Sequence, residues 1–481
     1  MIAHTKASIL RLLPKSQFAR SVSVLVGGTA SAQLLIVLTA PILTRLYLPE
    51  DFGMVAVFMG LIALINIFSS LRYELAIPLP EDDQEAVNLV ALCLLILLGI
   101  TICSILAVLF FGVSIAVVLG VPKLANYLWL LPVGVLFSGT YLIFNYWTLR
   151  TKHFTRLAYT KLRQTLVSIA IQLTTFKFGG VSLVFAQIVG QSLGIAMLGK
   201  PMITRPEFKQ ITFAGIRQAA AQYRRFPMFT TWAGLLNTGG NQLPPLVFAA
   251  LFSVGEAGVY ALTHRVLTLP MSVVGNAVQS VFFSNTSEAY RNGHLSHLVT
   301  NVCDKLVQIA MPLALILVFV APDLFVFVFG GNWQESGEFA RWMSPWLFLQ
   351  FCTGPLATVF AAIEKQHIGL IMQAQLFTVR VIMILIGATS GSIQTTIVLF
   401  SFGSAVSYLV FLVVIFYTTG AQSNALFRSL SRAFLLSIIV ISPLFYLSLV
   451  PEPQTSLIIT SVVTTLALVF LRYGMLYRYG V

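Results

Sequence analysis

The sequence predicts an all-α polytopic membrane protein with about fourteen transmembrane helices. Two observations carry this prediction. Of the 481 residues, 57% are hydrophobic and 9% are charged, whereas roughly a quarter of the residues of a soluble domain are charged. The basic residues also concentrate in alternate gaps between long apolar runs, as they do in multi-pass proteins. We therefore expect the net charge of +13 to orient the chain in a membrane and not to bind nucleic acid.

About fourteen apolar runs are long enough to cross a hydrocarbon core of about 30 Å. Basic residues precede the first run, as in a signal peptide, but this run continues well past the candidate cleavage site Ala30-Ser31-Ala32. We therefore expect an uncleaved first helix. The runs cover residues 22–44, 52–70, 86–111, 125–149, 159–177, 181–199, 228–252, 257–283, 306–330, 340–363, 368–388, 393–417, 432–449 and 455–472.

The distribution of basic residues predicts that both termini are cytoplasmic. With the N-terminus inside, most of the 29 Lys and Arg residues fall in cytoplasmic gaps, as the positive-inside rule requires. The longest polar gap then separates two six-helix bundles. The predicted divisions are a cytoplasmic N-terminal segment (1–21), the first bundle (22–199), a cytoplasmic linker (200–227), the second bundle (228–417), and the last two helices with the C-terminal tail (418–481).

A short internal repeat predicts that the two bundles are related. Leu46–Met54 (LYLPEDFGM) aligns with Leu251–Val259 (LFSVGEAGV), which matches an acidic residue and a glycine at one helix start. Each copy follows the first helix of its bundle, and an even number of helices separates them. The bundles are therefore expected to be parallel repeats about an axis along the membrane normal, an arrangement that places a substrate path between them.

No group of residues in the sequence is arranged for catalysis. The acidic run Glu81-Asp82-Asp83 lies at an expected helix start, where negative charge is favourable. The sequence has no phosphate-binding loop of the Gly-x-x-x-x-Gly-Lys-Ser/Thr type, and its four cysteines have no Cys-x-x-Cys spacing. We therefore expect a protein that is not an enzyme and that needs no cofactor or metal.

Two arginines fall inside apolar runs and point to an anionic ligand. Arg265 lies in the expected eighth helix, and Arg380 lies in the eleventh, after Gln373. An ionisable residue at membrane depth is costly and usually functional, and a guanidinium suits phosphate oxygens. The competing interpretation is a structural ion pair or coupling group, for which Asp323 in the ninth helix is the available carboxylate.

A second basic group lies at the expected cytoplasmic mouth. Arg72, Arg224 and Arg225 would make that mouth electropositive and contact the substrate, although the positive-inside rule alone would also place them there. Asn241, in the first helix of the second bundle, adds an uncharged hydrogen-bonding group that could face sugars.

Several of these segments resemble one known family. Residues 44–53 (TRLYLPEDFG), 71–77 (LRYELAI), 223–227 (YRRFP), 257–267 (AGVYALTHRVL), 329–333 (FGGNW) and 345–348 (PWLF) are similar, in order and spacing, to the Wzx-type lipopolysaccharide oligosaccharide flippases of the multidrug/oligosaccharidyl-lipid/polysaccharide exporter superfamily. The similarity covers roughly residues 20–417, and the last two expected helices carry no matching motif.

The resemblance implies a flippase in the bacterial inner membrane. It would move an undecaprenyl-pyrophosphate-linked oligosaccharide from the cytoplasmic to the periplasmic leaflet by alternating access through a cationic cavity. The product would feed O-antigen, capsule or exopolysaccharide synthesis, with the polysaccharide polymerase and other assembly proteins as candidate partners. Arg265 is the first choice for a pyrophosphate contact, because the family carries a basic residue after its Tyr-Ala-Leu motif.

Three alternatives remain open at this stage. A multidrug exporter of the same superfamily typically has twelve helices and an intramembrane carboxylate site, which this sequence does not match. A peptidoglycan-precursor flippase would work by a mechanism closer to that of the oligosaccharide flippases. In the sequence, only the motif resemblance separates these two possibilities. A membrane polysaccharide polymerase or ligase should carry a large periplasmic loop, whereas the gaps expected outside are short.

Overall fold

The computed structural model describes residues 17–269 and 271–448 and the separate positions 461, 464, 465, 467–469 and 471–473. The described chain is helical, with short 3-10 and π segments and no strand. The long helices are α2 (Gln17–Leu46), α3 (Pro49–Phe68), α4 (Asp83–Val118), α5 (Leu130–Arg150), α6 (Phe154–Thr174), α7 (Gly180–Ile203), α9 (Thr231–Leu251), α10 (Val254–Leu267), α11 (Asn276–Arg291), α12 (Leu295–Phe329), α13 (Gln334–Leu356), α15 (Gln366–Ala388), α16 (Ile393–Thr418) and α17 (Ser423–Ser448).

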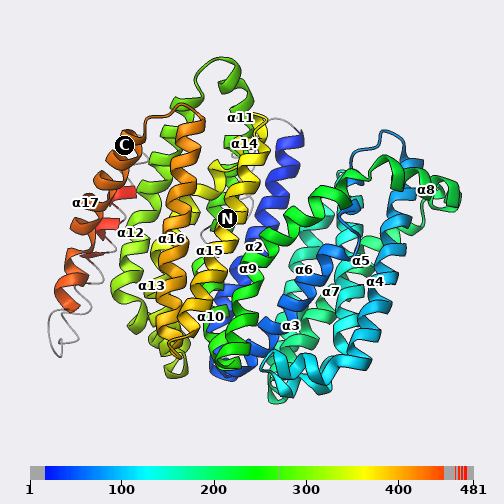
Figure 1. Ribbon diagram of the computed structural model, residues 1–481, viewed down its shortest axis with the longest axis horizontal. Coiled ribbons are helices and arrows are strands. Elements are labelled where there is room, and N and C mark those ends of the chain that lie inside the picture. The colour runs from blue at the N-terminus through cyan, green and yellow to red at the C-terminus, as the bar shows by residue number, and fades with distance from the viewer. Residues whose placement is uncertain are drawn as a thin grey trace, which may run out of the picture. The chain divides into compact units, whose positions relative to one another are not determined.

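The chain divides into two compact units, Met1–Gly258 and Val259–Val481. In the first unit, α4, α5, α6 and α7 run side by side (Figure 1), with α2 packed on α6 and α9 on α3. In the second unit, α12 packs against α13 and α17, and α16 packs against α13 and α15. The predicted division into bundles at 22–199 and 228–417 remains a prediction.

Ten helices in the described part of the chain are long and apolar enough to span a membrane, which confirms a multi-pass membrane protein. Among the expected spans, α6, α9 and the α10–α11 pair are not in this set. These helices are the more polar ones, carrying for example Lys161, Asn237, Asn241 and His264. Since lipid does not solvate such groups, these polar side chains are expected to face protein or water and not lipid. Much of the expected helix at 455–472 lies outside the described residues.

The expected single helix at 257–283 is broken, which corrects that prediction. Helix α10 ends at Leu267, a π-helical turn covers Met271–Gly275, and α11 begins at Asn276. The sequence has a proline at position 270, and a proline lacks the amide hydrogen needed to continue a helix. The hydrophobic pattern continues through this point, so apolar length alone did not reveal the break.

A further helix, α8 (Phe213–Gln222), forms in the segment that we expected to be a cytoplasmic linker. Its N-cap is Thr212, whose hydroxyl accepts a 3.1 Å hydrogen bond from the amide of Gly215. Such a cap satisfies one of the amides that the first helical turn leaves without a partner. Helix α8 packs on α4.

Two prolines within α12 free backbone carbonyls, and arginines from other segments bind both of them. Pro312 cannot donate to the Gln308 carbonyl, and Pro322 cannot donate to that of Val318. Arg472 donates to the Gln308 carbonyl at 3.3 Å, and Arg341 donates through Nε to the Val318 carbonyl at 3.1 Å. Because an unsatisfied carbonyl in an apolar medium is costly, both arginines stabilise α12.

The two copies of the repeat contact each other within the first unit. A Cβ atom added to Gly53 would lie 1.7 Å from the Val254 carbonyl oxygen, and one added to Gly258 would lie 1.9 Å from the Pro49 carbonyl oxygen. In the alignment above, Pro49 corresponds to Val254 and Gly53 to Gly258. The contact is therefore reciprocal, as an approximate twofold relation between the helix starts of α3 and α10 requires, and only glycine fits at either position.

Candidate functional site

Arg265 is an exposed arginine of α10 and the first residue of the candidate site. One side of α10 is fixed to α13, because the hydroxyl of Thr263 donates a 3.0 Å hydrogen bond to the Ser336 carbonyl. Arg265 lies on a different side and is exposed. Within the described residues, this guanidinium has no ion pair and no side-chain hydrogen bond. The exposed guanidinium is therefore available to bind an anion.

Arg380, the other intramembrane arginine, lies in an aromatic cage. Its guanidinium carbon is 4.9 Å from the ring centre of Trp346 and 5.6 Å from those of Phe400 and Tyr408. Its Nε donates to the Ser404 hydroxyl at 3.2 Å. Aromatic faces attract a cation electrostatically, and Arg380 is only 3% exposed. An anion could reach it only after the cage opened, which sets it apart from Arg265.

The cage also contacts the helix that carries Arg265. The ring of His264 stacks between Tyr260, at 5.6 Å, and Trp346, at 6.0 Å between centres. Tyr260 and His264 come from α10, while Trp346 comes from α13. The stacked rings hold α10 in a fixed rotation beside Arg380, so the two arginines belong to one packed assembly although only one of them is accessible.

Asp323 is the carboxylate of the competing ion-pair interpretation, which remains a prediction. Asp323 is exposed near the end of α12, whereas Arg380 is buried. Among the described residues, Asp323 forms no ion pair with Arg265. Gln373 is partly exposed on α15, and Asn241 is partly exposed on α9, where its amide donates to the Asn237 carbonyl at 3.1 Å.

Arg72 lies in a tight turn after α3 and faces a buried carboxylate. Leu71 and Arg72 adopt positive φ angles of 48° and 64°, which are strained for such side chains. The Nη1 of Arg72 is 3.6 Å from Oε1 of Glu74, whose side chain is fully buried. A Cβ atom on Gly234 of α9 would come within 2.6 Å of the guanidinium. The turn and the Glu74 carboxylate hold Arg72 in place. Because Gly234 has no side chain, it leaves room for the guanidinium.

Burial raises the pKa of Glu74, while the hydrogen bond from Ser70 and the charge of Arg72 oppose this shift. The folded protein therefore favours the protonated acid more than the unfolded chain does. Glu74 contributes its full stability below the ordinary pKa of 4.5 and loses this contribution as the pH rises through the raised folded value.

We expect Glu74→Gln, which keeps the side chain neutral, to flatten the decline of thermal stability between about pH 5 and pH 8. Thermal unfolding of the purified protein across this range is the measurement. Glu81→Gln is the matched control, because Glu81 is an exposed carboxylate in the neighbouring turn. An unchanged pH slope in Glu74→Gln would contradict this account of the buried carboxyl group.

The other basic residues of the expected mouth, Arg224 and Arg225, are exposed. The preceding Tyr223 fixes their position, because its hydroxyl donates a 2.8 Å hydrogen bond to Glu85 in the first turn of α4. Burial and this hydrogen bond raise the pKa of Tyr223 to about 12, so the hydroxyl remains a donor at neutral pH. The acidic turn that we expected at a helix start therefore also anchors the basic segment.

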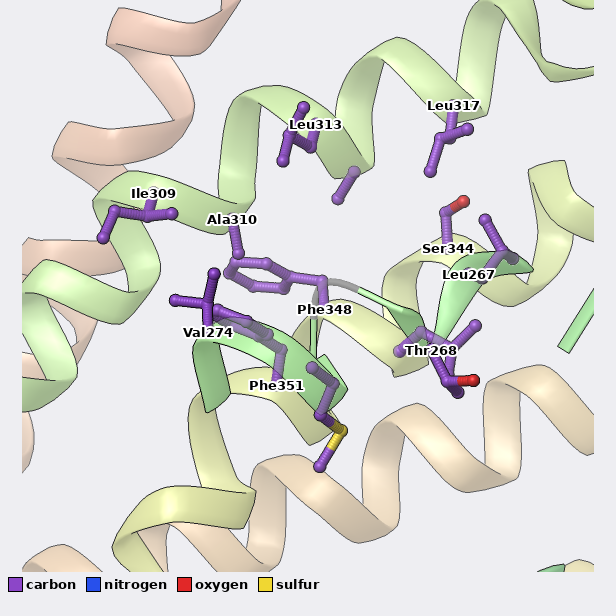
Figure 2. A pocket seen from close by; sticks show the side chains of 13 residues that line it. Leu267, Thr268, Val274, Ile309, Ala310, Leu313, Leu317, Ser344, Phe348 and Phe351 are labelled. Atoms are coloured by element: carbon purple, nitrogen blue, oxygen red, sulfur yellow. The ribbon is translucent and has the colours of Figure 1, made fainter. Parts of the chain in front are cut away.

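Sequence reasoning missed an apolar cavity of about 110 Å³ beside the end of α10. Its walls come from α10, the π-helical turn, α12 and α13, and Figure 2 shows Leu313, Phe348 and Phe351 pointing into it. The available signal in the sequence was the proline at position 270, because proline interrupts the regular hydrogen bonding of a helix. No group of three metal-ligating side chains occurs within the described residues.

Comparisons with known proteins identify a matching protein family and a related sequence. A family described as "Polysaccharide biosynthesis protein" matches residues 42–338. The succinoglycan biosynthesis transport protein ExoT of Rhizobium meliloti (strain 1021) is 24% identical over 310 residues, which are 62% of this chain and 60% of that protein. The chain thus matches less than two thirds of this relative's length.

Two solved structures have the same fold at low sequence identity. The lipid II flippase MurJ, in an inward closed conformation, matches with a TM-score of 0.74 and 13% identity over 96% of this chain and 98% of its own. A multidrug resistance MATE family transporter of the MOP superfamily, in an inward-facing conformation, matches with a TM-score of 0.66 and 15% identity over 81% and 94%. These likenesses confirm the predicted fold class.

Proposed function

Because this chain belongs to the polysaccharide biosynthesis protein family, we propose that it is a flippase for undecaprenyl-pyrophosphate-linked oligosaccharide units. It carries each unit from the cytoplasmic to the periplasmic leaflet by alternating access, and the units supply O-antigen, capsule or exopolysaccharide synthesis. The transporter fold and the similarity to a protein named as a succinoglycan transport protein support this proposal. In this function the chain moves its substrate without changing any covalent bond.

The observation that carries the proposal is the exposed guanidinium of Arg265, which forms no ion pair within the described residues. A lone cation at membrane depth costs several kcal/mol unless it meets a partner, and the described residues offer it no carboxylate. A pyrophosphate supplies the missing negative charge, and its oxygens can accept two parallel hydrogen bonds from a guanidinium. The pyrophosphate of a lipid-linked sugar is therefore the ligand that fits this site.

The remaining candidates have supporting roles in this proposal. Arg72, Arg224 and Arg225 attract the headgroup at the cytoplasmic mouth, and Gln373 and Asn241 offer hydrogen bonds to sugars. Arg380 binds phosphate only in a conformation in which its aromatic cage has opened. The protein lies in the bacterial inner membrane with both termini in the cytoplasm, where it delivers units to the polysaccharide polymerase.

The membrane potential favours transport in this direction. A pyrophosphate diester carries about two negative charges, and moving one charge outward through 100 mV releases about 2.3 kcal/mol. Release into the periplasmic leaflet nevertheless requires moderate affinity, so a single accessible arginine is better suited than a cluster of cations. No coupling ion is assigned in this scheme.

Cells that lack their own oligosaccharide flippase provide the test of function. Expression of this chain, with the matching repeat unit, is expected to restore surface polysaccharide and to remove the lipid-linked units that accumulate on the cytoplasmic side. Radiolabelled lipid extracts and surface polysaccharide gels measure the two effects. Continued accumulation, despite normal amounts of the protein in the membrane, would contradict the proposal.

A peptidoglycan-precursor flippase is the second candidate, because the fold match to the MurJ structure extends over nearly the whole of both chains. The phosphate chemistry of the two substrates is the same, so Arg265 does not distinguish them. Rescue of a strain depleted of its lipid II flippase would favour this candidate, whereas rescue of the oligosaccharide flippase strain alone would exclude it.

A further inference from the structure

The apolar cavity beside α10 has no role in the phosphate chemistry described above. Its volume is about 110 Å³, and it is partly open to its surroundings. The walls belong to the second unit and include the end of α10, the π-helical turn, α12 and α13 (Figure 2). A cavity of about 150 Å³ with an apolar lining stays dry and binds benzene, so this space can hold a small branched hydrocarbon.

The side chains of the lining offer no free hydrogen-bond donor to a ligand. Of its two hydroxyl side chains, Thr268 donates to the His264 carbonyl at 2.7 Å, and Ser344 donates to the Ala340 carbonyl at 2.6 Å. The other lining side chains are apolar. Water or a sugar in this cavity would lose hydrogen bonds without replacement. The occupant must therefore be hydrocarbon.

The cavity lies close to the phosphate site along the chain. Thr268, part of its wall, is three residues after Arg265, and residues with this spacing are neighbours on one helix surface. At about 1.5 Å per residue, the two positions are separated by roughly 5 Å along the helix axis. One molecule with a phosphate joined directly to a hydrocarbon could occupy both sites.

The break after α10 makes one wall adaptable. Met271 begins the π-helical turn and lines the cavity, and its methyl group is 2.6 Å from the place where a Cβ atom on Gly354 would stand. Methionine is unbranched and adjusts its shape to irregular apolar ligands. Because Gly354 has no side chain, the Met271 side chain has space to move.

We propose that the cavity binds the isoprene unit next to the pyrophosphate of the polyprenyl carrier, while Arg265 binds the pyrophosphate. This inference rests on the proposed function. The first isoprene unit is a branched five-carbon group joined directly to the phosphate, which matches both the size of the cavity and its position. The rest of the polyprenyl chain leaves through the open side. The protein thus recognises the junction between the pyrophosphate of the carrier and its first isoprene unit.

Filling the cavity tests the inference with purified, full-length protein. Ala314→Leu narrows the space from α12, Ala314→Val narrows it less, and Ala107→Leu places the larger side chain on an exposed position of α4 as a control. The probes are farnesyl pyrophosphate, dodecyl pyrophosphate with an unbranched chain, and inorganic pyrophosphate. Binding is followed by calorimetry, and thermal unfolding confirms that each variant is folded.

We expect Ala314→Leu to weaken binding of farnesyl pyrophosphate about tenfold, the loss of roughly two buried CH₂ groups. Ala314→Val should give a smaller loss, and Ala107→Leu none. Inorganic pyrophosphate should bind all of these variants like the original protein. Unchanged affinity of Ala314→Leu for farnesyl pyrophosphate would overturn the cavity assignment, and equal losses for dodecyl pyrophosphate would overturn the isoprenoid specificity.

The two proposals fail in different ways. If neither farnesyl nor inorganic pyrophosphate binds the original protein, or if both bind Arg265→Ala normally, the phosphate site and with it the proposed function are wrong. If Arg265→Ala loses both probes while Ala314→Leu loses neither, the function stands and only the cavity inference falls.

Discussion

Arg265→Ala is expected to reduce oligosaccharide export at least about 100-fold, because it removes two charge-assisted hydrogen bonds of about 1.5–3 kcal/mol each. Lipid-linked units should then accumulate in the cytoplasmic leaflet while the protein remains folded, since the side chain is accessible and supports no other described group. Export by the flippase-deficient strain, together with protein levels in the membrane, measures the effect.

Two further variants show whether the charge or its geometry is responsible. Arg265→Lys keeps the charge but loses the planar fork that matches phosphate oxygens, so it should retain part of the activity. Arg291→Ala, at an exposed arginine ending α11, is the control and should export normally. Normal export by Arg265→Ala at normal protein levels would contradict the cationic site at its central residue.

Gly53→Val and Gly258→Val are expected to cause the second-largest loss. A Cβ atom at either position would overlap a carbonyl oxygen of the opposite segment, at 1.7 Å and 1.9 Å. Overpacking typically costs about 1–3 kcal/mol, and here the obstacle is backbone, which adapts poorly. Both segments lie at the expected periplasmic ends of α3 and α10. Each variant is therefore expected to lose transport as well as thermal stability.

The reciprocal geometry adds a sharper expectation. Because either substitution separates the same pair of helix starts, the double variant should lose less stability than the two single losses combined. Gly99→Ala is the control, since a Cβ atom there meets nothing within 4 Å and alanine favours the helix by about 1 kcal/mol. Additive losses of stability in the double variant would refute the paired contact. An unchanged unfolding temperature of Gly53→Val would also refute it.

Hydrophobic pattern predicted most helices because each lipid-facing or buried run needs a fixed length. It failed where the cause is local backbone chemistry. Helix α10 ends at Leu267 within an apolar run, and the cap at Thr212 starts α8 within a polar one. The short repeat was informative, because Gly53 and Gly258 are required by a close contact that the structure shows.

The two intramembrane arginines looked equivalent in sequence but are not equivalent in structure. The rings that enclose Arg380 come from Trp346 on α13 and from Phe400 and Tyr408 on α16. No local pattern connects these positions, so their meeting could not be predicted. The apolar cavity is similar, because its walls come from the side chains of three helices and one turn, whose packing no local pattern predicts. The substrate roles of all the named residues remain predictions.

Transport in reconstituted vesicles tests the central claim most directly. Purified protein is incorporated into liposomes that contain a fluorescent undecaprenyl-pyrophosphate oligosaccharide, and a membrane-impermeant quencher reports how much of it is exposed in each leaflet. The account predicts rapid exchange between leaflets with the original protein and slow, protein-free rates with Arg265→Ala. Equal exchange by the two proteins, or none by the original, would contradict it.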